Sequence, residues 1–145
     1  MDAWTKFAES IFRLNGLLLE AGEGISRPIG QSSARWQVLG GLGYGPKTVA
    51  QMAREIAHAR QSVQRVADAL IAEGLIAARE KPDDKRTLLL ELTPAGVAVL
   101  HAIYERQLAW SNRVMRKLSA RQLTALAKAL HEIGDVVERD NRPET

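Results

Sequence analysis

Cysteine is absent from this 145-residue sequence. Without a thiol, the chain cannot form a disulfide, sense redox changes through cysteine or hold a metal through thiolates. The sequence also has no uninterrupted apolar run of about 18 residues, so we expect no membrane-spanning helix and no membrane partner. The chain begins MDAWTKFAES, which lacks the basic start and apolar core of a secretory signal. These absences predict a cytoplasmic protein.

Residues that build catalytic or metal sites are also scarce. The histidines are His58, His101 and His131, and none has the HExxH spacing or another metal-ligand pattern. The glycine-rich stretch at 41–45, GLGYG, has neither the GxGxxG order nor the preceding strand of a phosphate-binding loop. We therefore expect no enzyme activity, no cofactor and no bound metal.

Net charge is small for a protein that binds nucleic acid. The chain has 20 Lys and Arg against 17 Asp and Glu, which gives a formal charge of +3. Residues 47–86 hold eight basic and six acidic side chains, so this segment carries +2. Bulk charge is thus a weak indicator of DNA binding, and any such binding must depend on a few well-placed contacts. The length suits one hydrophobic core, so we expect a single domain over residues 1–145.

Residues 48–76 predict two short helices joined by a turn. In the first helix, Thr48 and Gln51 are spaced as a capping box, in which the hydroxyl and the amide each satisfy a backbone N–H. Gly74 is well placed to end the second helix in a left-handed conformation. Two helices with a three-residue turn are typical of the helix-turn-helix, whose second helix enters the major groove of DNA. The apolar stripes are Val49, Met52, Ala53 and Ile56, then Val63, Val66, Ala67, Leu70 and Ile71, and the turn is Ala57, His58 and Ala59.

The opposite face of the second helix carries side chains suited to DNA. Gln can bind the adenine edge at two points, Arg can bind the guanine edge, and Ser can donate to a base or a phosphate. Taken alone, such a face is usually only a solvated surface, but its place in this motif favours base readout. The predicted contacts are Arg60, Gln61, Ser62, Gln64 and Arg65, which share the face with Asp68, and the predicted backbone contacts are Thr48 and His58.

A β-hairpin is predicted directly after the two helices, over residues 75–92. The sequence KPDD at 81–84 has turn chemistry, and the residues after it alternate, with Leu88, Leu90 and Leu92 on one face. Lys85 and Arg86 therefore lie at or beside the tip, where Arg86 suits a narrow minor groove. We predict that Asp84 orients the Arg86 guanidinium through a two-point hydrogen bond. The alternative is a polar turn with a weak surface ion pair.

With these features, the chain resembles the MarR family of transcriptional regulators, the multiple antibiotic resistance group. The resemblance covers nearly all of the chain, and the wing Asp84-x-Arg86 followed by Leu90-x-Leu92-Thr93-x-x-Gly96 is its most specific part. The other segments that carry it are RWQVLGGL at 35–42, TVAQMAREI at 48–56, RQSVQRVADALIAEGLI at 60–76, PDDKRTLLLELTPAG at 82–96 and two long helical patterns after it.

The resemblance implies a mainly α fold with a small β-hairpin wing, a winged helix-turn-helix of the α+β kind with N- and C-terminal dimerisation helices. It implies a homodimeric repressor, or sometimes an activator, whose partner is double-stranded DNA and whose binding responds to small aromatic or anionic molecules. By position, Gln61, Ser62, Gln64 and Arg65 correspond to the recognition-helix contacts, and Asp84 and Arg86 to the wing. Ala57 and Ala59 depart from the pattern, because many members have Gly in the turn and Ser or Thr capping the recognition helix.

The rest of the chain predicts a scaffold around a DNA-binding unit at 33–92. We expect a first helix within residues 1–24, broken into a loop by Gly22, Gly24, Pro28 and Gly30, and a second helix capped by Ser33. Thr93-Pro94 is a strong helix start, and Ser119 with Gln122 opens a last helix. Residues 1–24 and 94–139 form the predicted dimerisation part. Its apolar stripes are Trp4, Phe7, Ile11, Leu123, Leu126, Leu130, Ile133 and Val137, which suit either intrachain core or a two-fold interface.

Two points stay open at the level of sequence. Trp36, Tyr104, Trp110 and Arg13 suit an effector pocket but are typical of core or surface as well, so we assign no pocket residues. The alternative to a DNA-binding regulator is a winged-helix protein-interaction module, whose same faces would bind a protein partner.

Overall fold

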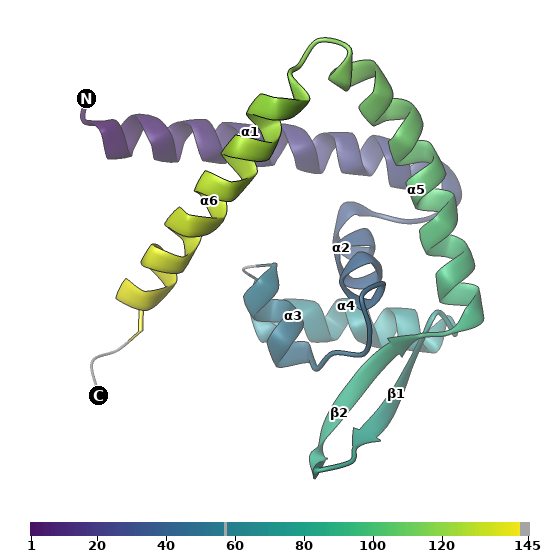
Figure 1. The fold of residues 1–145 in the computed structure, drawn as a ribbon. Helices are drawn as coiled ribbons and strands as arrows, with labels where there is room; N and C mark the ends of the chain where they lie inside the picture. Colours follow the sequence, from purple (N-terminus) through teal and green to yellow (C-terminus); the bar gives the residue numbers. More distant parts are fainter. Residues whose placement is uncertain (57, 143–145) are drawn as a thin grey trace. The chain divides into compact units, whose positions relative to one another are not determined.

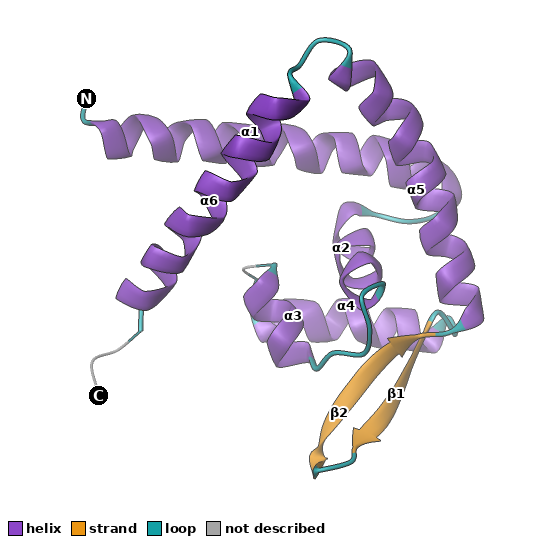
Figure 2. Ribbon diagram, in the orientation of Figure 1, coloured by secondary structure: helices purple, strands orange, loops and turns teal. Residues whose placement is uncertain are grey.

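The computed structural model describes residues 1–56 and 58–142, and within them it is mainly helical with one β-hairpin (Figures 1 and 2). This confirms the predicted fold class. Two compact units are present, residues 1–107 and 108–145. Over the described ranges, no helix is both long and apolar enough to cross a membrane. In chain order the elements are α1 (Ala3–Ser26), the short 3-10 helix η1 (Arg27–Ile29), α2 (Ser33–Leu42), α3 (Val49–Glu55), α4 (Arg60–Ala72), β1 (Ile76–Lys81), β2 (Asp84–Leu92), α5 (Pro94–Met115) and α6 (Ala120–Asp140).

Helix α1 runs past Gly22 and Gly24, two of the four residues that we expected to break it. It continues to Ser26, and the chain turns only after η1, at Gly30, whose φ is 74°. Gly22 lies inside the helix because α1 and α2 approach closely there, and a Cβ on Gly22 would lie 2.5 Å from Ser33 Oγ. Glycine in a helix interior costs about 0.5–1 kcal/mol relative to alanine. Here that cost is offset by the close packing that the missing side chain permits.

The prediction that Ser33 caps the second helix is wrong by one residue. Ser32 is the N-cap, and its Oγ accepts from Arg35 N at 3.2 Å. Ser33 instead ties α2 to α1, because its Oγ donates to the Leu19 carbonyl and its N–H donates to Glu23, both at 2.8 Å. Sequence spacing cannot separate two adjacent serines, whereas the tertiary contact with α1 does.

The helix-turn-helix is formed by α3 and α4, with α2 packed against α4 (Figure 1). The capping box of α3 is confirmed, since Thr48 N donates to Gln51 at 2.8 Å and Gln51 N donates to Thr48 Oγ1 at 3.1 Å. Gly74 has a φ of 73° just after α4, as predicted. The buried apolar core of this part comprises Val38, Leu39, Leu42, Met52, Ala53, Val63, Ala67, Leu70, Ile76 and Leu90.

The hairpin of β1 and β2 is antiparallel and begins with Ile76 paired to Leu92. Pro82 and Asp83 form the predicted turn between the strands. Of the predicted leucine face, Leu90 is buried and Leu88 is exposed, so the hairpin is anchored at its base and its tip projects outward. Lys47 adds a single antiparallel bridge to β2, with Lys47 N donating to the Leu90 carbonyl at 3.0 Å and Leu90 N donating back at 2.8 Å.

Helix α5 begins as the sequence predicts. Thr93 caps it by accepting from Gly96 N at 3.1 Å, and Pro94 is its first residue. A Cβ on Gly96 would lie 2.0 Å from the Leu75 carbonyl oxygen, so only glycine fits where α5 crosses the start of the hairpin. The last helix, α6, is capped by Ser119, whose Oγ accepts from Gln122 N at 3.3 Å.

Candidate nucleic-acid interface

Helix α4 separates its apolar and polar residues onto opposite faces. Val63, Ala67 and Leu70 are buried, and they hold the helix against the core. The predicted DNA-contacting side chains on the other face are all exposed, namely Arg60, Gln61, Ser62, Gln64 and Arg65. The structure therefore brings the predicted recognition residues together on one accessible helix surface.

Gln64 has a side-chain partner on this face. Its Nε2 donates to Asp68 Oδ1 at 2.8 Å, across one turn of α4. This contact uses one of the two N–H donors of the Gln64 amide. The second N–H and the carbonyl oxygen can still bind another partner. Asp68 thus positions Gln64 for a contact at its outer edge, a role that the sequence pattern did not reveal.

Helix α4 begins without a side-chain cap. Ala59 is the N-cap, has an extended conformation with a ψ of 142°, and makes no side-chain cap hydrogen bond. His58 is exposed, and its backbone N–H donates to the Ala53 carbonyl at 2.9 Å. Ala57, which we predicted to lie in this turn, lies outside the described residues. Thr48, the other predicted backbone contact, is buried, and its hydroxyl already caps α3.

The wing tip contains an irregularity that presents its basic residues. Glu80 pairs with Leu88 and Lys81 pairs with Asp84, so residues 85–87 bulge out of the regular ladder. Bulges of this kind redirect side chains away from the pleat of the sheet. Lys85 and Arg86 are in this bulge, and both are exposed.

The Asp84 carboxylate holds the bulge by binding the backbone N–H of Arg86 and the hydroxyl of Thr87. Our prediction that Asp84 contacts the Arg86 guanidinium is wrong. The Asp84 Oδ1 accepts from Arg86 N at 3.0 Å and its Oδ2 accepts from Thr87 Oγ1 at 2.8 Å. These hydrogen bonds, first that from Thr87 and then that from Arg86, lower the pKa of Asp84, and the charge of Lys81 adds to the effect. A short carboxylate bonds the backbone two residues ahead more readily than it reaches a long side chain. The Arg86 guanidinium is left available for another partner.

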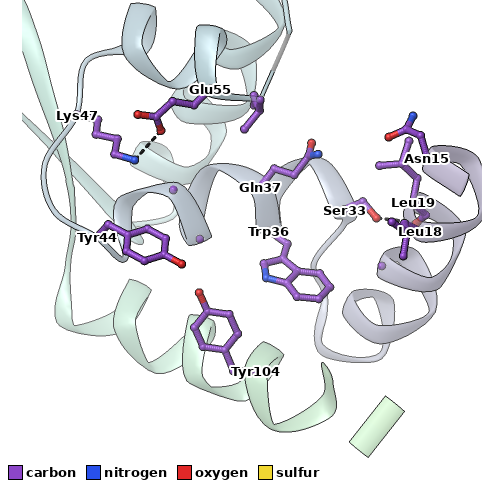
Figure 3. Close-up of a pocket in the computed structure, with 14 residues that line it drawn as sticks. Asn15, Leu18, Leu19, Ser33, Trp36, Gln37, Tyr44, Lys47, Glu55 and Tyr104 are labelled. Atoms are coloured by element: carbon purple, nitrogen blue, oxygen red, sulfur yellow. Dashed lines mark hydrogen bonds and ion pairs between the residues drawn. The ribbon is translucent and has the colours of Figure 1, made fainter. Parts of the chain in front are cut away.

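A separate pocket of about 560 Å³ lies beside α2, and residues of the first unit line it (Figure 3). Trp36 of α2, Tyr44 and Tyr104 of α5 give it an aromatic wall, and Figure 3 shows the two tyrosine hydroxyls pointing toward one another. Burial raises the pKa of Tyr104, and nearby Tyr44 raises it further. The remaining lining residues are Asn15, Leu18, Leu19, Gly22, Ser33, Gln37, Gly40, Gly41, Lys47, Glu55 and Ile56.

Sequence reasoning identified only part of this pocket. Trp36 and Tyr104 line it, whereas Arg13 and Trp110 are not among its lining residues. Tyr44 and Lys47 were missed, although the sequence GYGPK places them in a loop between two predicted helices. Loops commonly carry binding residues, and that signal was available. Over the described residues, no group of three or more His, Cys, Asp or Glu is arranged to hold a metal ion.

A family model and a curated relative both match this chain. Residues 29–87 match the family model described as the MarR family. An uncharacterized protein of Mycobacterium tuberculosis is 36% identical over 132 residues, which are 91% of this chain and 92% of that protein.

Solved structures show that the fold is shared. A mutant MarR from E. coli complexed with operator DNA superposes with a TM-score of 0.75 at 18% identity, over 92% of this chain and 99% of that chain. Staphylococcus aureus MarR in complex with salicylate and kanamycin gives a TM-score of 0.76 at 20% identity, over 93% of this chain and 92% of that chain.

Proposed function

The chain belongs to the MarR family of transcriptional regulators, and on that basis we propose that it is a homodimeric repressor of transcription. In this proposal it binds a palindromic operator and releases it when a small aromatic or anionic molecule binds. The observation that carries the proposal is the exposed polar face of α4, held by a buried apolar stripe and followed directly by a wing whose bulge carries Lys85 and Arg86.

The face of α4 supplies the base contacts. Gln61 and Gln64 each offer an amide donor and acceptor, which together match the adenine edge, and Arg65 offers the paired donors that match guanine. Ser62, in the first turn, contacts a base or a phosphate, and Arg60 reaches the phosphate backbone. The net charge of the chain is small, so bulk attraction to DNA is weak, and that attraction does not depend on sequence. These contacts therefore supply the preference for one sequence.

The wing supplies a second contact in the neighbouring minor groove. Arg86 enters that groove, where a narrow width concentrates negative potential, and Lys85 lies against the flanking phosphates. The backbone hydrogen bonds of Asp84 support this role, because they hold the bulge that carries both basic residues. His58 gives a further phosphate contact, and Thr48 gives a weaker one because its hydroxyl is engaged in capping α3.

Dimerisation is supported by apolar surface that the single chain leaves uncovered. Helix α6 has no buried residue, yet Leu123, Leu126 and Leu130 recur along it at helical spacing. Helix α1 exposes Trp4 and Phe12 in the same way. Monomeric proteins rarely leave large contiguous apolar patches in water. A two-fold dimer over residues 1–24 and 94–139 would cover them, and would place two recognition helices about 34–36 Å apart, one turn of DNA.

The pocket beside α2 supports the effector part of the proposal. Its volume of about 560 Å³ lies within the usual range for small-molecule sites, about 300–1,000 Å³. An aromatic ring fits against Trp36 and the two tyrosines, and Lys47 provides a positive charge for an anionic group. A bound small molecule here would contact the residues that precede and end α3, namely Lys47 and Glu55.

The test is a binding titration with fluorescently labelled DNA taken from immediately upstream of the coding sequence. We expect saturable binding by the dimer that falls steeply with salt, and selection from a random DNA pool should recover a palindrome. Arg65→Ala should cost about 1–3 kcal/mol and relax the preference at one base pair in each half-site. Arg121→Ala on α6, an equally exposed arginine outside the DNA-binding unit, is the matched control.

The same experiment separates the two classes of function. A winged-helix module that binds a protein partner would show no sequence preference among DNA duplexes, and Arg65→Ala would bind DNA like Arg121→Ala. Recovery of a palindrome whose preference Arg65→Ala leaves unchanged would contradict the assignment of Arg65 while keeping that of the regulator.

A further inference from the structure

Lys47 lies where three parts of the DNA-binding unit meet. Its backbone pairs with Leu90 of β2, which ties the loop before α3 to the base of the wing. The next residue, Thr48, caps the start of α3. The Lys47 Nζ lies 2.6 Å from Oε2 of Glu55, the last residue of α3. One lysine therefore contacts the wing and the end of the helix that leads into the recognition helix.

Lys47 also faces the pocket, together with its partner Glu55 (Figure 3). Its Nζ lies 5.7 Å from the centre of the Tyr44 ring, within range of a cation–π contact. The Lys47 side chain is 18% exposed, whereas that of Glu55 is 47% exposed. Among the described lining residues, Lys47 is the one cation and Glu55 the one anion. An anionic ligand in this pocket thus meets one attractive and one repulsive charge.

We propose that Lys47 is the residue through which the pocket selects an anionic ligand, and that the ligand acts by taking the Lys47 ammonium away from Glu55. This inference rests on the proposed function, since it assigns the regulation of that same pocket. The ammonium has three N–H donors, but two carboxylates sharing it would lie close enough to repel each other. The ion pair with Glu55 and the ion pair with the ligand are therefore alternatives.

Releasing Glu55 changes α3 because of where this carboxylate lies. It is the last residue of the helix, where the backbone carbonyls make the end negative and an unpaired acid is unfavourable. Lys47 neutralises it in the structure. Once the lysine turns to a ligand, the unpaired carboxylate loosens the last turn of α3. Helix α4, whose N-cap is Ala59, begins a few residues after α3 ends at Glu55 and has no side-chain cap. In this proposal the looser end of α3 changes the orientation of α4.

Operator binding without any ligand tests the charge arrangement first. Lys47→Met leaves Glu55 unpaired and should imitate the ligand-bound state, lowering operator affinity about fivefold or more, the scale of allosteric couplings. Glu55→Gln should stay within about threefold of wild type, as for the loss of one partly exposed ion pair. The double variant Lys47→Met/Glu55→Gln removes the unpaired carboxylate and should recover operator affinity. If the double variant stays as weak as Lys47→Met, Lys47 acts on DNA directly and the proposal is overturned.

Ligand titrations test the second half, with salicylate and its uncharged analogue salicylamide as the probes. By calorimetry, wild type should bind salicylate about tenfold or more tightly than salicylamide, and Lys47→Met should lose that preference. Glu55→Gln should bind salicylate more tightly, because no ion pair must be broken. In the same variant, salicylate should change operator affinity less than about twofold, because binding and release are coupled reciprocally. Lys128→Met on α6, which removes the lysine of a longer and more exposed ion pair with Glu132, is the control for loss of a surface charge.

The outcomes distinguish this inference from the proposed function. A wild type that shows no sequence-specific DNA binding would contradict the proposed function itself. A wild type that binds its operator but responds to neither probe, or whose response to salicylate is unchanged in Glu55→Gln, would overturn only the role of the Lys47–Glu55 pair.

Discussion

Asp84 shapes the wing through the backbone rather than through an ion pair with Arg86. Its two carboxylate oxygens bind the Arg86 N–H and the Thr87 hydroxyl, which folds the bulge at residues 85–87. The spacing of Asp84 and Arg86 is the same for a side-chain clamp and for a backbone turn, so the sequence does not distinguish them. In the structure the backbone of Arg86 is held in place by Asp84, which does not bind the guanidinium.

Replacement of Arg86 by alanine should weaken binding to most operators alike. An arginine in the minor groove contributes electrostatic attraction more than a choice among bases, so the salt dependence should change more than the sequence preference. We expect the slope of log affinity against log salt to fall by about 1 per lost contact. Titrations at several salt concentrations measure it, with Arg121→Ala as the control. Identical slopes for Arg86→Ala and wild type would remove Arg86 from the interface.

Replacing glycine by alanine should have opposite effects on stability at Gly96 and at Gly24. Gly96→Ala places a methyl group 2.0 Å from the Leu75 carbonyl oxygen, so the backbone must move. We expect a loss of about 1–3 kcal/mol, as for other overpacked sites. Gly24→Ala, in the interior of α1, meets no atom within 4 Å and should stabilise the chain by about 0.5–1 kcal/mol. Urea denaturation measures both, and equal effects would contradict the packing of α5 on the start of the hairpin.

At the scale of the element, α3 and α4 begin in contrasting ways. Helix α3 has a complete capping box from Thr48 and Gln51. Helix α4, which carries the proposed DNA contacts, begins at Ala59 without a side-chain cap. Its stability therefore comes from the buried stripe of Val63, Ala67 and Leu70 rather than from its first turn.

Installing a cap at Ala59 should stabilise α4. The residue already has the extended conformation of an N-cap, so Ala59→Ser can accept from the first turn without a backbone change. The expected gain is about 0.5–2 kcal/mol in the free energy of unfolding, and Thr48→Ala should lose a similar amount. Thermal and urea denaturation of both variants test this. No gain from Ala59→Ser would mean that another group already satisfies the start of α4.

At the scale of the whole molecule, α1 and α6 each carry an apolar stripe that is exposed in the single chain. Leu126 is 57% exposed and Trp4 is 59% exposed in the single chain. Such side chains contribute about 1.5–3 kcal/mol each when they become fully buried. Several of them together provide enough free energy for a stable association, which supports the proposal of a homodimer.

Leu126→Glu should dissociate the proposed dimer. A charge in the centre of a buried apolar interface has no partner, and its desolvation opposes association. Sedimentation velocity should show a dimer for wild type and a monomer for the variant, with circular dichroism confirming that the helices persist. His131→Glu, an exposed position on the same helix outside the apolar stripe, is the control and should stay dimeric. A wild type that sediments as a monomer would contradict the proposal.

The sequence by itself determined the elements of this protein and their order. Caps, turns and apolar periodicity are local, so they predicted the helix-turn-helix, the hairpin, the exposed face of α4 and the start of α5. Tertiary structure decided how these parts meet. Helix α1 continues through Gly22, where it packs closely on α2. Ser32 rather than Ser33 caps α2, and Asp84 binds the backbone N–H of Arg86 rather than its guanidinium. Tertiary structure also brought Tyr44, Lys47, Glu55 and Tyr104 around one pocket, because contacts between residues distant in sequence depend on packing that no local pattern records.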